Sequence, residues 1–236
     1  MYGYGYGYYG FDWTYVLLII GMLLSLAAST RLKSTFSYYR RIRSASGLTG
    51  AETAERILRA AGITDVHVRA ISGSLTDHYD PRTKTVSLSE DIYDKTSLAA
   101  VGVAAHECGH AIQHAIGYAP LECRSAIVPV ANFGSTLSWP LFLIGLFSGI
   151  RPLVTAGIVL FSLAVLFQLV TLPVEIKASS RALKMLQSTG ILGSDETKGA
   201  RKVLTAAAMT YVAALAASIL QLLRLLILAG GRRRDD

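Results

Sequence analysis

The stretch that organises this chain is SLAAVGVAAHECGHAIQHAI, residues 97–116. Its length and its small apolar residues predict one helix, on which residues four apart share a face. His106 and His110 would therefore direct their imidazoles at one point, as two nitrogen ligands of a zinc ion do. Glu107 lies one residue further round the helix, where its carboxylate can reach a metal-bound water. An HExxH motif on a helix is typical of zinc metalloproteases that use the glutamate as general base.

The composition indicates a membrane protein. Of the 236 residues 52% are hydrophobic and only 17% are charged, whereas a soluble domain carries about a quarter charged residues. The net charge of +7 arises from cations beside long apolar runs, which favours a membrane surface over nucleic acid as the partner. The two cysteines, Cys108 and Cys123, are too few for a disulfide framework. We expect Cys108, opposite the histidines on the helix, to be a small core residue.

Four apolar runs are long enough, or nearly so, to cross a bilayer, which takes about 20 mainly apolar residues. They occupy residues 13–29, 126–148, 153–172 and 200–229. Arg151 and Pro152 form a very short connection between the second and third runs, which predicts a transmembrane hairpin, and Pro140 predicts a kink in its first helix. The expected fold is a mainly α membrane protein with about four transmembrane helices and a small α+β, zincin-like domain.

The small domain should contain a helix, a strand and a β-hairpin before the HExxH helix. Thr49 and Glu52 have the spacing of a capping box at the start of a helix over residues 49–61. A strand is expected over residues 63–71, and two strands over 74–80 and 83–89 around a turn. An exposed strand here could bind an extended peptide by main-chain pairing, or it could simply cover the site helix. The sequence leaves both readings open.

The distribution of basic residues predicts the orientation in the membrane. Residues 31–125 and 173–203 together hold 18 Lys and Arg, against four in the short loop and the C-terminal tail. Because basic residues stay in the cytoplasm, the bulk of the chain should lie there. The arginines at 232–234 are the exception, and we expect the last helix nevertheless to span.

This orientation divides the chain into six expected regions. They are a disordered Tyr/Gly tail (1–11), a first transmembrane helix (12–30), a cytoplasmic metalloprotease region (31–125), a transmembrane hairpin (126–172), a cytoplasmic helix starting at Pro173 and carrying the third zinc ligand (173–203), and a fourth transmembrane helix with a basic tail (204–236).

A catalytic zinc needs three protein ligands and an open position, and two residues compete for the third place. His114 continues the i, i+4 series, but it lies eight residues after His106, about 12 Å along a straight helix. That is far for Zn–N bonds of about 2 Å. Glu175 follows the hairpin that the HExxH helix precedes, so the returning chain brings it to the same membrane face. We therefore prefer Glu175 and expect His114 to be a supporting residue.

Four segments carry a family resemblance. They are HECGHAIQH (106–114), LTDHYDPRTKTVSLSE (75–90), SAIVPVANFGSTLSWP (125–140) and VEIKASSRA (174–182). Together they resemble the YugP-type neutral zinc metallopeptidases over about residues 47–228. The resemblance implies zinc held by His106, His110 and Glu175, with Glu107 catalytic. More distantly the chain resembles HtpX-type and CAAX-prenyl membrane proteases, which have an aspartate where this chain has Ser179. The group that orients a zinc histidine must then come from elsewhere, or be that hydroxyl.

The expected function is a membrane-embedded zinc metalloendopeptidase with one Zn²⁺ per chain. It would hydrolyse membrane-associated proteins or peptides at the cytoplasmic face, and assembly with other membrane proteins or with copies of itself stays open. The candidates for supporting residues or oxyanion donors are His78, His114, Tyr118, Ser179 and Arg181. The alternative is a non-catalytic zinc-containing membrane scaffold or adaptor, against which Glu107 argues, because a structural zinc site needs no base.

Overall fold

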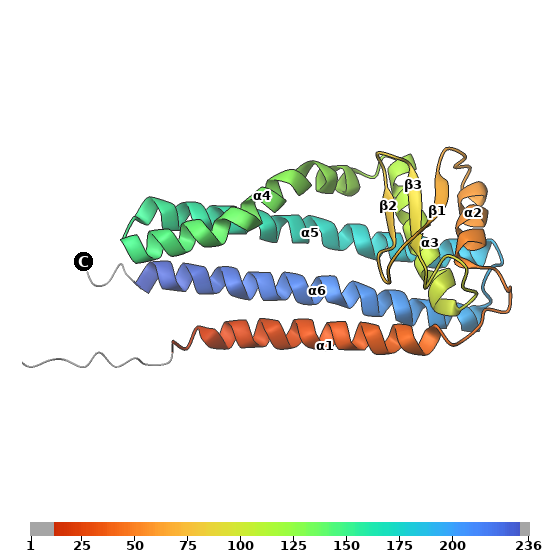
Figure 1. Ribbon diagram of the computed structural model, residues 1–236, viewed down its shortest axis with the longest axis horizontal. Helices are drawn as coiled ribbons and strands as arrows, with labels where there is room; N and C mark the ends of the chain where they lie inside the picture. Colours follow the sequence, from red (N-terminus) through yellow and green to blue (C-terminus); the bar gives the residue numbers. More distant parts are fainter. Residues whose placement is uncertain (1–11, 232–236) are drawn as a thin grey trace, which may run out of the picture.

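The computed structural model describes residues 12–231, so the Tyr/Gly tail and the arginines at 232–234 lie outside the described residues. Four long helices run side by side along the molecule (Figure 1). They are α1 (Tyr15–Tyr39), α4 (Ala119–Ser148), α5 (Arg151–Ser188) and α6 (Ser194–Gly231). Within the described chain these four are long and apolar enough to cross a membrane, which confirms the expected fold class.

The long helices form a row in which α4 packs on α5, α5 on α6, and α6 on α1. Helix α6 extends along the whole of α1, because Arg224 near its end reaches the start of α1. There the Arg224 Nε donates to Thr14 Oγ1 at 3.2 Å, and the guanidinium lies 4.6 Å from the ring centre of Tyr15. Arg224, a cation deep inside the last apolar run, is therefore partnered rather than exposed to lipid.

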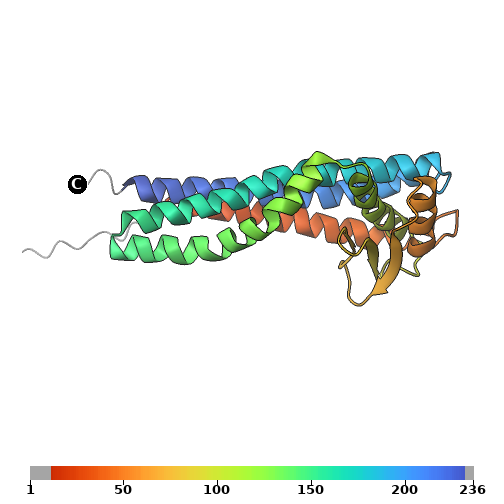
Figure 2. The same ribbon diagram turned by 90° about the horizontal axis from the view of Figure 1, so that it is seen from above.

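The remaining elements gather at one end of the long helices, as Figure 2 shows from a second direction. They are α2 (Gly50–Ala60), β1 (His67–Ile71), β2 (His78–Asp80), β3 (Thr85–Ser89) and α3 (Leu98–Ala115). The sheet order is β1-β3-β2, with β2 antiparallel to β3, as the predicted hairpin requires, and β1 parallel to β3. Both β1 and β2 are edge strands.

Helix α3 is the centre of this end of the molecule. It packs on α2 and on the sheet on one side and on α5 and α6 on the other. Its small residues allow these close approaches, and Cys108 is fully buried among them, as expected. Burial raises the pKa of the Cys108 thiol, so this cysteine is a packing residue rather than a nucleophile.

The capping box at the start of α2 is formed as predicted. The Glu52 amide donates to Thr49 Oγ1 at 3.1 Å, while Glu52 Oε2 accepts from the Thr49 amide at 2.8 Å and from its hydroxyl at 2.9 Å. These bonds satisfy backbone N–H groups at the start of the helix that have no acceptor within the helix.

Two helix boundaries differ from the expectation. The helix expected to begin at Pro173 does not exist as a separate element, because α5 runs unbroken from Arg151 to Ser188 with Pro173 inside it. A proline removes only one backbone hydrogen bond, and helices packed in a membrane tolerate that loss. Helix α4 begins at Ala119 rather than near 126, with Pro120 in its first turn, where a missing N–H costs nothing.

Candidate metal centre

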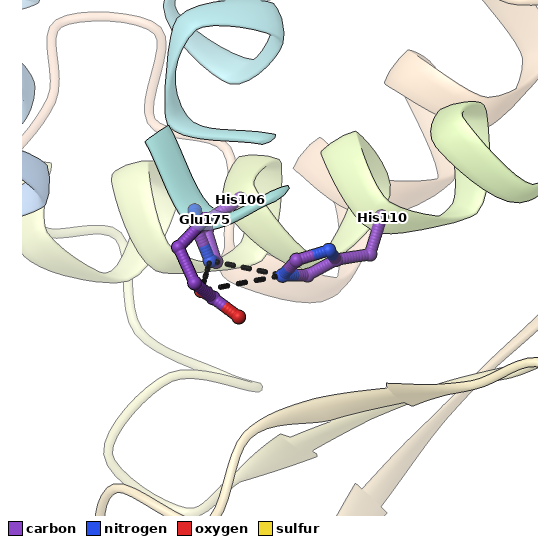
Figure 3. A group of neighbouring side chains, drawn as sticks. All are labelled: His106, His110 and Glu175. Atoms are coloured by element: carbon purple, nitrogen blue, oxygen red, sulfur yellow. Dashed lines mark hydrogen bonds and ion pairs between the residues drawn. The ribbon is translucent and has the colours of Figure 1, made fainter. Parts of the chain in front are cut away.

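Three side chains from two helices converge on one point (Figure 3). His106 and His110 extend from α3, and Glu175 extends from α5 on the opposite side. The two imidazole Nε2 atoms are 3.2 Å apart, and Glu175 Oε2 lies 3.3 Å from that of His106 and 3.6 Å from that of His110. Glu175 is only 3% exposed, so its carboxylate is committed to this cluster.

These separations fit a single zinc ion. Ligand atoms about 2.0–2.1 Å from a tetrahedral zinc lie about 3.3–3.4 Å from each other, close to the three spacings of this cluster. Among the described residues, the cluster holds three potential ligands from His, Cys, Asp or Glu. Three protein ligands and one open position are the pattern of catalytic zinc, since structural sites have four protein ligands.

Hydrogen bonds at the far side of each imidazole direct Nε2 toward the cluster. Ser179 Oγ lies 3.1 Å from Nδ1 of His106, and Gln113 Oε1 lies 3.0 Å from Nδ1 of His110. Gln113 is fully buried, and its amide also donates to the carbonyl of Val174 at 2.9 Å, the residue next to Glu175. Such contacts fix the tautomer and ring orientation of a metal-binding histidine.

Of these two supporting residues, the sequence predicted only Ser179 as a candidate. The Ser179 hydroxyl contacts His106 Nδ1, which was one of the two possibilities left open. Gln113 was missed. Its signal was its position three residues after His110, on the same face of an otherwise apolar helix.

Arg124, one turn into α4, is the other partner of the Glu175 carboxylate. Its Nη1 lies 3.0 Å from Glu175 Oε1, the oxygen that faces away from the histidines. Arg124 was missed because residues before 126 were expected to lie outside the helix. The early start of α4 aims this side chain at the site.

Gly109 allows α3 and α5 to touch between the ligands. A Cβ atom at Gly109 would lie 2.5 Å from the carbonyl oxygen of Ala178, far inside van der Waals contact. The glycine of the HExxH motif therefore sets the separation of the two helices that carry the three converging side chains.

Glu107 faces the same space as the ligands. It is 7% exposed and lines a cavity of about 200 Å³ together with His106, Glu175 and Ser179. The cavity is completed by side chains of α1, α6 and the β1–β2 loop that the sequence analysis did not single out. The polar ones among them are Asp77, Thr210 and Tyr211.

Comparison with known proteins agrees with this geometry. Residues 14–230 match the family model described as "Putative neutral zinc metallopeptidase". The chain belongs to this family. It is also 48% identical to the "Putative membrane protease YugP" of Bacillus subtilis (strain 168) over 217 residues, which cover 92% of this chain and 96% of that protein. No solved structure gives a significant match.

The other candidate residues lie away from the cluster of His106, His110 and Glu175. His114 Nδ1 is 2.8 Å from the hydroxyl of Tyr79 on β2, so it links the site helix to the edge strand. His78 is exposed, and its Nδ1 contacts the Thr76 carbonyl at 2.9 Å. The guanidinium of Arg181 lies 5.7 Å from the ring centre of Tyr118. None of these four candidates is among the described residues that line the cavity.

The charges around the centre act on His110 in opposing directions. Burial disfavours its cationic form, but the hydrogen bond with Glu175 and the carboxylates of Glu107 and Glu175 outweigh that effect and raise the pKa of His110. The same negative environment that holds a proton would hold a divalent cation. Burial, with smaller contributions from Asp65 and Asp80, raises the pKa of Tyr79 to about 12, so its phenol remains protonated beside His114.

Proposed function

We propose that this chain is a zinc-dependent membrane endopeptidase in which Glu107 is the general base. The observation that carries the proposal is the convergence of three donor atoms, 3.2–3.6 Å apart, beside a cavity that Glu107 also lines. Family membership supports the zinc and the peptidase class. His106, His110 and Glu175 would hold one ion per chain.

The chemistry is hydrolysis of a peptide bond. When bound at this centre, zinc would polarise the scissile carbonyl and lower the pKa of a bound water toward neutrality. Glu107 accepts the proton of that water and later donates it to the leaving amine. Ser179 and Gln113 hold the histidines in the required tautomer, and the cavity walls limit access of bulk water.

Tyr211 is the group we assign to the developing oxyanion. The described residues lining the cavity include three with hydroxyl groups, Ser179, Thr210 and Tyr211. The first contacts His106 Nδ1, and the Thr210 hydroxyl donates to the Ala207 carbonyl at 2.6 Å. Tyr211 interacts with Glu175, so its hydroxyl lies beside the centre, and we assign it to donate to a substrate oxygen, a contribution that catalysis of acyl transfer requires besides the metal. We prefer it to His78, His114, Tyr118 and Arg181, which do not line the cavity.

The substrates we propose are membrane-associated proteins cut at the cytoplasmic face. Arg151 is the first residue of α5, and Glu175 lies 24 residues further along the same helix. This separation is about 36 Å of helix. The hydrocarbon core is about 30 Å thick, so the site would lie just outside it, on the side that holds most of the basic residues. The edge strand β2, linked to the site helix by the contact between Tyr79 and His114, offers main-chain groups to an extended substrate.

The decisive experiment combines zinc content with cleavage of a casein-type substrate by the purified protein. Wild-type protein should contain about one zinc and cleave, while Glu107→Gln should keep the zinc and lose cleavage by at least about a hundredfold, since general acid–base catalysis is worth that much. Equal cleavage by both proteins would overturn the role of Glu107. Zinc without cleavage in the wild type, across soluble and membrane-bound substrates, would instead favour a scaffold.

A further inference from the structure

A second cleft, of about 590 Å³, lies between the C-terminal half of α1 and the N-terminal part of α6. Its polar wall includes Arg31 from α1 and Arg201 and Lys202 from α6, with the hydroxyls of Thr35 and Tyr38 beside them. Its apolar wall includes Met209, two turns further along α6. This cleft therefore combines cations and hydroxyls at one end with apolar surface at the other.

The three cations of the cleft have no acidic partners. Within residues 12–231, no carboxylate is paired with Arg31, Arg201 or Lys202, and none lines the cleft. All three side chains are exposed. Arg40, at the same end of the molecule, is by contrast paired with Asp91 at 3.4 Å. The cleft therefore carries three positive charges close together, without a carboxylate among the described residues to neutralise them.

The cleft lies at the level along α1 and α6 where the exposed apolar surface ends and the charged surface begins. On α1 the large exposed aliphatic side chains extend as far as Leu26, which is 60% exposed, and the first cation follows at Arg31. On α6 the order is reversed, with Lys202 before Met209, which is 44% exposed. The two antiparallel helices therefore pass from lipid-facing to water-facing surface at the same level.

We propose that this cleft is a binding site for an anionic phospholipid. The headgroup phosphate would lie between Arg31, Arg201 and Lys202, with hydroxyl donors at its rim, and an acyl chain would extend past Met209 along the lipid-facing side of α6. Arginine and lysine clusters at this level of a membrane protein attract anionic headgroups, and each cation adds to the preference. A free phosphate would use the cations but gain nothing from the apolar wall.

The lipid site adjoins the proposed active site without overlapping it. Lys202 and Met209 line the lipid cleft, whereas Val203 and Ala207 of the same helix line the cavity that contains His106 and Glu107. Helix α6 thus separates the two spaces. The inference does not depend on catalysis, because it rests on the charge and position of the cleft alone.

Native mass spectrometry of the purified full chain can test the proposal. The protein is incubated in detergent micelles with equal amounts of phosphatidylglycerol and phosphatidylcholine, and the ratio of the two bound lipids is measured. The triple variant R31Q/R201Q/K202Q should lower the preference for phosphatidylglycerol by at least about tenfold, because each cation near an anionic headgroup contributes about a fivefold factor. Zinc content, measured in parallel, reports whether the variant is folded.

Two control variants sharpen the test. R56Q/R59Q/R82Q removes the same number of charges from α2 and the β2–β3 turn, and it should keep the wild-type preference. R31K/R201K keeps the charges and should largely keep it too, which separates loss of charge from loss of folding.

Three outcomes would overturn the proposal. They are an unchanged lipid preference in the cleft variant, an equal loss in the α2 control, and displacement of the lipid by inorganic phosphate, by the soluble headgroup glycerophosphoglycerol or by a polyglutamate peptide at similar concentration. The last would identify a general anion site or a protein-docking site.

Discussion

The guanidinium of Arg124 lies 3.0 Å from one oxygen of Glu175, and the other oxygen of the same carboxylate faces both histidines. This division leaves one oxygen for a metal ion and holds the carboxylate in place through a charge-assisted bond. The carboxylate is almost fully buried, so the arginine also offsets a charge that would otherwise be costly in that position.

We expect Arg124→Met to weaken zinc binding by about 10–100-fold, the usual effect of losing a partner that orients a metal ligand. Arg124→Lys should restore part of the affinity, since it keeps the charge but not the planar fork. Competition with a chelator of known affinity measures the change without reference to activity. Unaltered affinity in Arg124→Met would show that Glu175 is positioned by its own helix alone.

The identity of the third ligand can be tested by two matched alanine variants. Glu175→Ala should leave a two-histidine site and remove most of the bound zinc, because a stable catalytic site needs three protein ligands. His114→Ala should retain the zinc, since His114 contacts Tyr79 rather than the cluster. Elemental analysis of the two purified proteins compares them. The reverse result would transfer the ligand role to His114.

The close approach of α3 and α5 at Gly109 should make that position intolerant of any side chain. Gly109→Ala places a methyl group against the Ala178 carbonyl, so we expect a loss of about 1–3 kcal/mol of stability and a weaker metal site. Gly102→Ala on the same helix meets only ordinary contact, 3.4 Å to the Ala200 Cβ, and should be neutral or stabilising by up to about 1 kcal/mol. Thermal unfolding and zinc content report both effects. Equal behaviour of the two variants would contradict the packing argument.

The capping box of α2 should make stability depend on pH. Hydrogen bonds from the Thr49 amide and hydroxyl lower the pKa of Glu52 below its usual 4.5. Its contribution is therefore fully present above about pH 4.5 and is lost as the pH falls through the lowered value. Glu52→Ala should lower the unfolding temperature at pH 7 and have progressively less effect toward pH 3. Glu52→Gln keeps an acceptor but cannot titrate, so its smaller deficit relative to the wild type should also shrink toward pH 3, and a deficit that stays constant with pH would implicate another group.

Local patterns in the sequence were sufficient for part of the site. His106, Glu107 and His110 lie on one helix, so their geometry follows from the spacing alone. Glu175 followed from topology, because a hairpin returns the chain to the face it left. The capping box at Thr49 was equally local.

The roles of Arg124 and Gln113 could not be predicted from the spacing of residues in the sequence. Both depend on where a helix begins and which face it turns to a neighbour. The expected break at Pro173 failed because packing of α5 against α4 and α6 outweighs the loss of one hydrogen bond. The parallel pairing of β1 with β3 depends on a crossover that no local pattern records.

The division of the proposed zinc ligands between α3 and α5 has a consequence for the synthesis of the protein. A nascent chain that has emerged only as far as α3 carries two imidazoles and a base, yet it has no complete centre. The carboxylate is added only after the α4–α5 hairpin has been made and has returned. In the proposed peptidase, hydrolysis would therefore require that the α4–α5 hairpin has folded back and brought Glu175 to His106 and His110.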